Sequence, residues 1–259
     1  MPITSRENPM IKEAAALLKS KRAREENGLF LAEGARLCAE ASRSGIAVRR
    51  LFLTEEAKEK YPDYLRDLIP AAADVQEITP PVAEKLSDTK TPQGVFAVCE
   101  FPENRADFDR DGLFVVLDGL QDPGNIGTIL RTCDAMDVRG VLLCGSADIW
   151  SPKVLRASMG CLFRLPVAVF ADAAEAFSAL HRYGCTVFAS TLSANSVPLN
   201  QICFPKRSAV VIGNEGSGIP EEDLARSDTL VTIPMPGRAE SLNAASAAAI
   251  LIYSAAAGG

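Results

Sequence analysis

The sequence is poor in residues from which many proteins build their sites. It has one histidine, His181, within a segment of amphipathic helical spacing, and aromatic residues make up 6% of its 259 residues. A histidine-based metal cluster is therefore excluded, and a helix-surface or helix-end position for His181 is favoured over a general base. No apolar run is long enough to cross a bilayer, and the N-terminus lacks the order of a signal peptide. We expect a cytoplasmic protein that needs neither a metal nor a membrane.

The cysteines lack the spacing of a metal site or a redox motif. There are seven of them, an odd number, and no two form a CxxC arrangement. Most lie in apolar surroundings, as in VLLCG and VFAVCE. This usage predicts reduced, buried thiols in place of a disulfide framework or a zinc site.

Positive charge is scarce overall but concentrated near the N-terminus. The net charge of −6 argues against nucleic acid as a partner. The first 50 residues nevertheless carry ten Lys and Arg against six Asp and Glu, with an excess that peaks at Lys19, Lys21, Arg22 and Arg24. Because salt screens charges beyond about 8–10 Å, such a patch can bind RNA on an acidic protein. A solvated helix end is the alternative, and charge alone does not decide between them.

The apolar pattern divides the chain into two halves. Residues 1–101 predict a small α/β domain that begins with a helix and ends with a strand. The polar residues 102–112 lack periodicity and predict an interdomain linker. Residues 113–259 alternate continuous apolar strands with helices, which indicates a mostly parallel sheet covered on both faces.

Three segments of the second half interrupt this pattern, each directly after a strand, where α/β folds bind ligands. The first, residues 118–131, reads DGLQDPGNIGTILR and predicts a turn followed by a helix that begins near Asn125. Asn125 either caps this helix or binds a ligand. Arg131 lies in an otherwise apolar helix and either makes a surface salt bridge or faces a cleft.

The second segment, residues 210–219, reads VVIGNEGSGI and predicts a strand followed by a glycine-rich loop. Its spacing matches neither GxGxxG nor the GxxxxGK[ST] phosphate loop. Glu215 within the loop would repel a phosphate and suits a polar or cationic ligand. The alternative is a plain turn in which Glu215 caps a nearby helix.

The third segment, residues 233–246, reads IPMPGRAESLNAAS. Two prolines and Gly237 force an irregular backbone just after a strand. Ser241 is a natural N-cap for the last helix. The alternative to a ligand site is a capped C-terminal helix that docks on the sheet.

Together and in this order, the three segments closely resemble the signature motifs of the SpoU family of tRNA and rRNA ribose methyltransferases, in the SPOUT superfamily. The matching stretches are N-x-G-x-x-x-R at 125–131, IGNEGSGI, and IPMPGRAESLNAASA. In the first half, FLAEGARLCAEA and RRLFLT resemble the ribosomal-protein-like substrate-binding domain that often precedes the methylase. The resemblance covers nearly the whole chain, with domains at 1–101 and 113–259.

The resemblance implies a methylase domain tied in a trefoil knot, S-adenosylmethionine as methyl donor, and a homodimer with its catalytic site near the subunit interface. The catalytic residues that it implies are Arg131, Asn125, Glu215, Ser241 and Asn243. The cofactor-binding residues that it implies are Thr191, Leu192, Gly213, Asn214, Gly216, Ile233, Met235 and Leu242.

The implied reaction is 2'-O-methylation of a ribose in structured RNA. We expect Arg131 to grip an RNA phosphate and polarise the 2'-hydroxyl, because a guanidinium stays charged in proteins and loses its proton only at high cost. The ribosomal-protein-like domain favours rRNA over tRNA, and the basic N-terminal segment would add phosphate affinity. A catalytically inactive RNA-binding protein is one alternative, although every polar motif position is filled. A nicotinamide-dependent enzyme is another, although it would need a GxGxxG turn that is absent.

Overall fold

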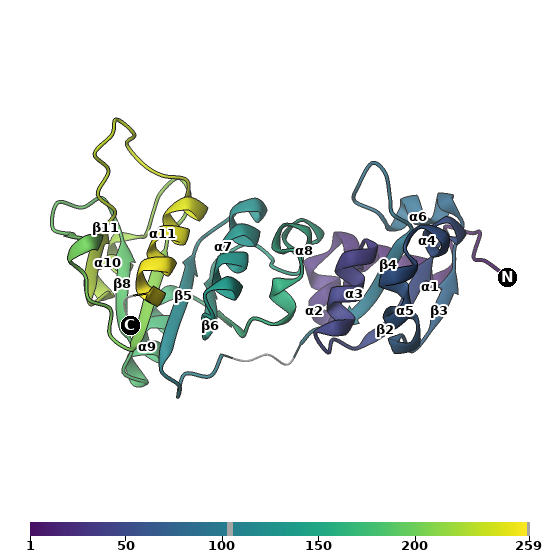
Figure 1. The fold of residues 1–259 in the computed structure, drawn as a ribbon, viewed down its shortest axis with the longest axis horizontal. Coiled ribbons are helices and arrows are strands. Elements are labelled where there is room, and N and C mark those ends of the chain that lie inside the picture. The colour runs from purple at the N-terminus through teal and green to yellow at the C-terminus, as the bar shows by residue number, and fades with distance from the viewer. Residues whose placement is uncertain (103–105, 258–259) are drawn as a thin grey trace. The chain divides into compact units, whose positions relative to one another are not determined.

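The computed structural model describes residues 1–102 and 106–257, so residues 103–105 of the predicted linker lie outside the described part. The chain forms two compact units (Figure 1). Unit 1 comprises Met1–Glu103 and Asp148–Phe163, and unit 2 comprises Asn104–Ala147 and Arg164–Gly259. The chain therefore passes between the units three times. Within the described residues, no helix combines the length and apolar character needed to cross a membrane.

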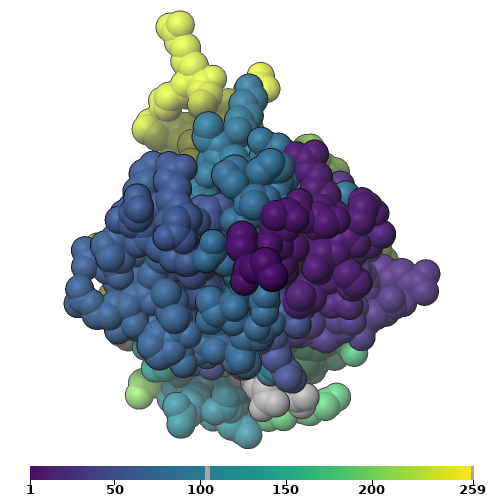
Figure 2. Space-filling view, turned by 90° about the vertical axis from the view of Figure 1, so that its right-hand side faces the viewer, coloured from purple at the N-terminus to yellow at the C-terminus, as the bar shows by residue number. Residues whose placement is uncertain are grey.

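Unit 1 is built on a four-stranded mixed sheet in the order β1-β4-β2-β3. Strand β4 is antiparallel to β1 and β2, whereas β3 is parallel to β2. The strands are β1 (Leu29–Glu33), β2 (Val48–Leu53), β3 (Val75–Glu77) and β4 (Val95–Glu100). The helices are α1 (Pro9–Lys19), α2 (Lys21–Asn27), α3 (Ala35–Arg43), α4 (Glu55–Lys60), α5 (Pro62–Ala71), α6 (Pro80–Leu86), α8 (Pro152–Ser158) and the 3-10 helix η1 (Cys161–Phe163). Figure 2 shows the surface of this unit, with its N-terminal residues in purple.

Helix α1 illustrates how local sequence sets an element of unit 1. The Asn8 side chain accepts a hydrogen bond from the Met10 N–H at 2.9 Å, and Pro9 takes the first turn, where an N–H has no helical partner. A buried stripe that includes Ile11 and Leu18 packs with α6 on the sheet. The predicted helix is therefore confirmed, and it covers one side of the unit's core.

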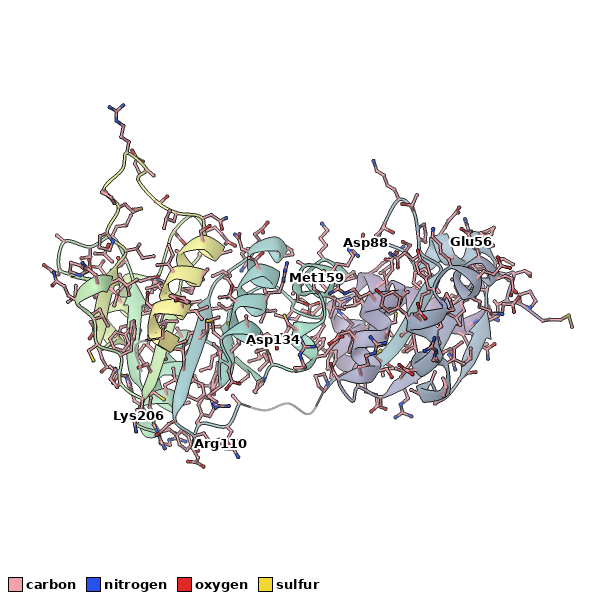
Figure 3. All side chains as sticks on the ribbon, viewed as in Figure 1. Glu56, Asp88, Arg110, Asp134, Met159 and Lys206 are labelled. Carbon is pink, nitrogen blue, oxygen red and sulfur yellow. The ribbon has the colours of Figure 1, made fainter. Side chains whose placement is uncertain are left out.

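The segment Asp148–Phe163 belongs to unit 1, whereas the sequence pattern predicts it as part of the second domain. The Arg24 guanidinium forms a buried ion pair with Asp148. The Trp150 ring stacks on Phe30 and Phe101, with ring centroids 4.9 Å and 5.0 Å apart. Arg156 of α8 donates to Asp88 at 2.8 Å (Asp88 is labelled in Figure 3). A distant part of the sequence thus supplies packing and charge partners to unit 1.

Unit 2 is built on a seven-stranded sheet in the order β7-β6-β5-β10-β8-β11-β9, and every neighbouring pair is parallel. The predicted parallel sheet is confirmed, while the trefoil knot stays a prediction. The strands are β5 (Gly112–Asp118), β6 (Gly140–Cys144), β7 (Val167–Phe170), β8 (Thr186–Ser190), β9 (Val197–Pro198), β10 (Arg207–Ile212) and β11 (Thr229–Thr232). The helices are α7 (Pro123–Ala135), α9 (Ala173–Arg182), the 3-10 helix η2 (Leu199–Gln201), α10 (Glu221–Arg226) and α11 (Ala244–Ala257).

Helices pack against the central strands of this sheet. Phe114 and Val116 of β5 join Val211 of β10 in a core cluster with α9. Helices α7 and α11 pack on each other, side by side in Figure 1, and α11 also packs on β5 and β10. Because β5, β10, β8 and β11 are parallel neighbours, their C-terminal ends lie together at one end of the sheet. The three motif segments follow β5, β10 and β11 and therefore begin at that end.

The cysteines and His181 lie outside the three motif segments, and their contacts are those of structural residues. Of the seven free cysteines, six are buried and Cys203 is exposed. Burial raises the pKa of Cys144 to about 12, with a further contribution from Asp118. His181 lies in the last turn of α9, where its Nε2 is 3.0 Å from an oxygen of Asp228. The predicted helix-end position of His181 is confirmed.

Candidate functional site

The second and third motif segments converge on one pocket in unit 2. Its volume is about 400 Å³, within the range of small-molecule sites. Residues that follow β8, β10 and β11 line it, together with the start of α11. All eight predicted cofactor-binding residues lie in its wall: Thr191, Leu192, Gly213, Asn214, Gly216, Ile233, Met235 and Leu242. The structure brings these residues together, and their role in binding stays a prediction.

A chain of hydrogen bonds joins one side chain from each motif. Asn243 Nδ2 donates to Asn125 Oδ1 at 2.9 Å, and Asn125 Nδ2 donates to Glu215 Oε1 at 3.2 Å. The Glu215 carboxylate also accepts from the backbone N–H groups of Asp122 at 2.9 Å and Gln121 at 3.2 Å. Three of the five predicted catalytic residues are thus directly connected.

Glu215 holds the turn that leads into α7. Burial alone would raise the pKa of this carboxyl, but hydrogen bonds from the Asp122 N–H, the Asn125 side chain and the Gln121 N–H lower it below its usual value. Its negative charge lies beside the N-terminus of α7, where the helix dipole favours an anion. The contacts of Glu215 fit the alternative that it caps a nearby helix.

The predicted helix caps at both motif helices need correction. Helix α7 begins at Pro123, and its N-cap is Asp122, whose side chain accepts from the Asn125 N–H at 2.8 Å. Helix α11 begins at Ala244, and the Asn243 side-chain oxygen accepts from the Ala245 N–H at 2.9 Å. Asn125 and Ser241 therefore do not act as caps, and Ser241 instead lines the pocket.

The glycine-rich loop of the second motif closes tightly on itself. Asn214 and Gly218 exchange two backbone hydrogen bonds of 3.0 Å, and Gly218 has a φ of +70°. A Cβ on Gly213 would lie 2.4 Å from the backbone carbon of Gly218, so a side chain does not fit there. Asn214 Nδ2 donates to the Gly119 carbonyl at 2.8 Å and ties this loop to the turn after β5.

Arg131 is exposed on α7, two turns from the start of the helix. It has no hydrogen-bond or ion-pair partner in the part of the chain that the structure describes, and it does not line the pocket. The sequence allowed Arg131 either a surface salt bridge or a position that faces a cleft. The described residues form no such salt bridge with Arg131. Its guanidinium is available to a ligand that approaches the outer face of α7.

The chemistry of the pocket fits S-adenosylmethionine. Leu192, Met235 and Leu242 provide apolar surface for an adenine ring. Glu215 is the one charged side chain among the described residues that line the pocket. A cationic sulfonium therefore meets no positive charge, and the pyrophosphate of a nicotinamide dinucleotide would find no Lys or Arg partner there.

The predicted RNA-binding cations of unit 1 fall into two groups. Lys19, Lys21 and Arg22 are exposed. Lys21 lies 3.6 Å from Glu25, and Arg22 lies 2.6 Å from Glu26, one helical turn away in each case. Arg24, by contrast, is 4% exposed and its guanidinium is bound by Asp148 and the Leu17 carbonyl. Arg24 thus stabilises unit 1, and its buried guanidinium is not available to RNA.

Comparisons with known proteins agree with this geometry. Residues 112–253 match the SpoU rRNA Methylase family, and residues 8–97 match the MRM3-like substrate binding domain. The crystal structure of an AdoMet-bound rRNA methyltransferase from Sinorhizobium meliloti is similar, with a TM-score of 0.85 and 30% sequence identity over 98% of this chain and 97% of that one.

Curated relatives match along nearly their whole length. The 23S rRNA (guanosine(2553)-2'-O)-methyltransferase RlmP of Bacillus subtilis is 34% identical over 97% of both chains. The 23S rRNA (uridine(2479)-2'-O)-methyltransferase of Streptomyces viridochromogenes is 32% identical over 98% of this chain and 91% of its own. The resemblance read from the three motifs is confirmed: the chain belongs to the SpoU rRNA methylase family and carries an MRM3-like substrate-binding domain ahead of its methylase domain.

Proposed function

We propose that this protein methylates the 2'-hydroxyl of a ribose in ribosomal RNA, with S-adenosylmethionine as donor. The observation that carries the proposal is the hydrogen-bonded chain from Asn243 through Asn125 to Glu215, which joins the three motifs beside one pocket. The Bacillus subtilis and Streptomyces viridochromogenes relatives are named as 23S rRNA methyltransferases, which supports ribosomal over transfer RNA as the substrate.

In this proposal the pocket residues bind and orient the donor. Main-chain groups of Gly213, Ile233 and Leu242 surround the adenine, and the apolar side chains of Leu192 and Met235 exclude water from it. When bound, the donor would supply a methyl group on a sulfonium sulfur, and the neutral thioether left when the C–S bond breaks is a good leaving group that needs no metal. The protein's own task is to hold the ribose hydroxyl in line with that methyl carbon.

Arg131 serves the RNA side of the reaction. As an exposed cation without a partner among the described residues, it grips the phosphate beside the target ribose and polarises the 2'-hydroxyl. Asn125 and Glu215 are positioning residues, because their contacts fix the turn from which α7 presents Arg131. Ser241 lines the pocket next to Asn243 and orients the donor.

A second copy of the chain completes the active form. Helix α11 exposes Ile250 and Tyr253, of which 40% and 63% are accessible, and α11 packs beside α7. Apolar side chains on the outer face of a helix indicate an interaction surface. We place the dimer interface on this α7–α11 face, which would bring Arg131 close to the partner.

The proposal is tested by incubating the full-length protein with tritiated methyl donor and either ribosomal or transfer RNA. Radiolabel recovered as a 2'-O-methylated nucleoside from ribosomal RNA is the expected result. RNA binding without incorporation would favour the inactive RNA-binding alternative. Tight NAD binding without S-adenosylhomocysteine binding in a calorimetric titration would favour a nicotinamide-dependent enzyme.

A further inference from the structure

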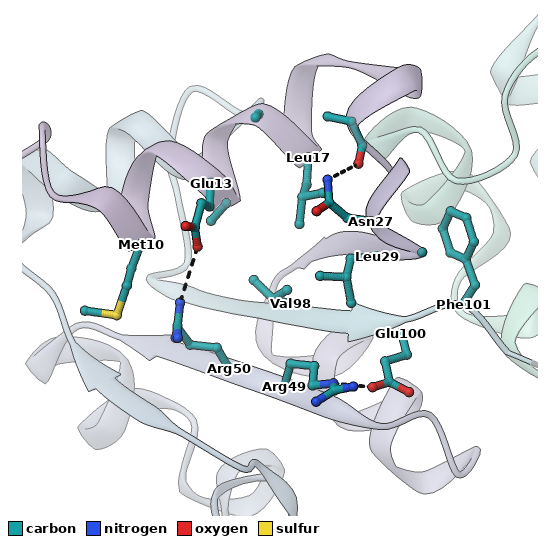
Figure 4. A pocket seen from close by; sticks show the side chains of 14 residues that line it. Met10, Glu13, Leu17, Asn27, Leu29, Arg49, Arg50, Val98, Glu100 and Phe101 are labelled. Carbon is teal, nitrogen blue, oxygen red and sulfur yellow. Dashed lines mark hydrogen bonds and ion pairs between the residues drawn. The ribbon is translucent and has the colours of Figure 1, made fainter. Parts of the chain in front are cut away.

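We propose that a groove in unit 1 receives one unpaired base of the RNA substrate, with guanine preferred. The proposal rests on the proposed function and names a feature that the RNA must present. The groove has a volume of about 720 Å³ and lies between helices α1 and α2 and the strands β1, β2 and β4 (Figure 4). A volume of this size accommodates a nucleoside.

The floor of the groove is apolar. Leu17 and Val98, which are 5% and 7% exposed, belong to the core cluster of unit 1, and Leu29 packs against that cluster. In Figure 4, these three side chains lie between Glu13 and Phe101. Leu17 and Val98 are themselves buried, so the apolar surface that a flat aromatic ring would cover comes chiefly from the half-buried Leu29 and Phe101.

The rim of the groove carries balanced charge. Arg49 pairs with Glu100, whereas Arg50 donates from Nε to Asp74, outside the groove lining, at 2.6 Å, and its Nη1 lies 4.0 Å from the Glu13 carboxylate. Two carboxylates on the rim disfavour a phosphate, because like charges repel. A neutral ring that carries both donors and acceptors, by contrast, finds partners on both kinds of side chain.

Guanine matches this rim better than the other bases do. Its adjacent N1–H and N2–H groups present two donors to one carboxylate, while its O6 and N7 accept from a guanidinium. Arg49 uses its Nε and Glu100 its Oε1 in their mutual bond. Among the described residues, this leaves the two Nη groups of Arg49, the Oε2 of Glu100 and the second lone pair of its Oε1 for a ligand.

The predicted RNA-binding cations are close in sequence to residues that line the groove. Lys19 follows the groove-lining Leu17, and Arg22 precedes the groove-lining Ala23. The exposed ion pairs of Lys21 and Arg22 are weak and readily exchanged for phosphate. Single-stranded RNA is bound in this manner, with cations on its backbone and a base turned into a pocket.

The groove is tested directly with two RNA oligomers of about nine nucleotides. One is oligouridine, and the other carries a single central guanosine. Fluorescence anisotropy with the full-length protein should show about tenfold tighter binding of the guanosine-containing oligomer. The variant Ala16→Trp, which places an indole at an exposed groove-lining position, should lose this preference.

Ala71→Trp is the matched control, because Ala71 is an exposed residue of α5 outside the groove. It should keep the preference, and circular dichroism checks that both variants are folded. Equal binding of the two oligomers by the unmodified protein, or an Ala16→Trp variant that still prefers guanosine, would overturn the proposal.

The same variants separate the groove from the proposed function. With ribosomal RNA, Ala16→Trp should raise KM about tenfold, leaving kcat and S-adenosylhomocysteine affinity unchanged. If the unmodified protein prefers the guanosine oligomer but methylates no RNA, the groove stands and the proposed function falls. If it methylates RNA but binds both oligomers equally, the proposed function stands and the groove falls.

Discussion

Two charged side chains of unit 2, Glu215 and Arg131, differ in whether other groups of the protein already bind them. Glu215 is held by two backbone N–H groups and the Asn125 amide, whereas Arg131 has no partner among the described residues. A satisfied charge at a helix start supports structure, and an unsatisfied exposed charge is available for a ligand. This difference separates positioning residues from the residue that we expect to contact RNA.

Arg131→Ala should lower the rate of methyl transfer to ribosomal RNA by about 100-fold, because a charged contact to the reacting nucleotide is lost. Thermal stability and S-adenosylhomocysteine affinity should not change, since the side chain is exposed and outside the pocket. Single-turnover kinetics and calorimetry measure these quantities. Arg131→Lys keeps the charge without the two-pronged donor geometry and should recover only part of the rate. A full rate in Arg131→Ala would remove Arg131 from the reaction.

Asp118 should make the stability depend on pH. Burial, and then the nearby Asp223, raise the pKa of its carboxyl to about 6, and its Oδ2 is buried without a partner among the described residues. The folded protein holds this proton more tightly than the unfolded chain, so stability falls as pH rises from about 4 to 6. Asp118→Asn should flatten this fall, as measured by melting temperature between pH 4 and 8. Parallel melting curves for the two proteins would contradict the assignment.

The sequence identified which residues gather at the pocket better than it identified what each one does. The side chains near the starts of the two motif helices are all of types that cap helices: Asp122, Asn125, Ser241 and Asn243. At each helix start, the sequence therefore offers more than one residue that could be the cap. The structure shows that Asp122 caps α7 and Asn243 caps α11, which depends on where the backbone becomes helical. The structural bonds of Asn214 could not be read from the sequence either, because the Gly119 carbonyl that it binds lies far along the chain.

At the scale of elements, Asn243 connects two helices through opposite ends of one amide. Its oxygen caps α11, and its nitrogen donates to Asn125 on α7. Asn243→Asp keeps the capping oxygen but loses the donor. It should therefore leave the melting temperature near that of the unmodified protein while lowering kcat.

Asn243→Ala is the companion variant, because it removes both bonds. It should lower kcat and also destabilise the protein by about 1 kcal/mol through loss of the cap. Denaturant unfolding and methyl-transfer assays distinguish the two variants. Equal stability loss in both would mean that the link to Asn125, and not the cap, stabilises this end of α11.

Long elements with clear periodicity were predictable, and of the short helices α6 and α8 were expected whereas α2 and α10 were not. Helix α1 and the central strands β5 and β10 were expected where they occur, because their apolar patterns extend over several residues. Helix α2 has seven residues and α10 has six, too few to establish a helical period. Strand β7 lies at the edge of its sheet and is only partly buried, although its four residues, VAVF, are all apolar.

At the scale of the whole molecule, the α7–α11 face is expected to join two copies. Tyr253→Asp places a charge on this apolar face and should convert a dimer to a monomer with much reduced activity. Light scattering coupled to size-exclusion chromatography measures the change in mass. Val169→Asp, at a residue of β7 that is 76% exposed, is the matched control and should leave the mass unchanged. A monomeric unmodified protein would refute the interface.

The division into two units was predictable only in part. The polar stretch before β5 marked one crossing of the chain between the units. The other two crossings flank Asp148–Phe163, a segment that reads as an ordinary strand-to-helix connection of the second half. Its attachment to unit 1 depends on Trp150 stacking on Phe30 and on the Arg24–Asp148 pair, contacts between residues too distant for periodicity to reveal.

This borrowed segment limits how the protein can be taken apart. A fragment that stops before the methylase half would leave Phe30 without its indole neighbour and Arg24 as a buried cation with no counter-ion. Chimeras that exchange front halves between relatives must transplant both pieces together. Unit 1 is therefore not separable as one continuous stretch of chain, because it needs a segment whose sequence lies within the methylase half.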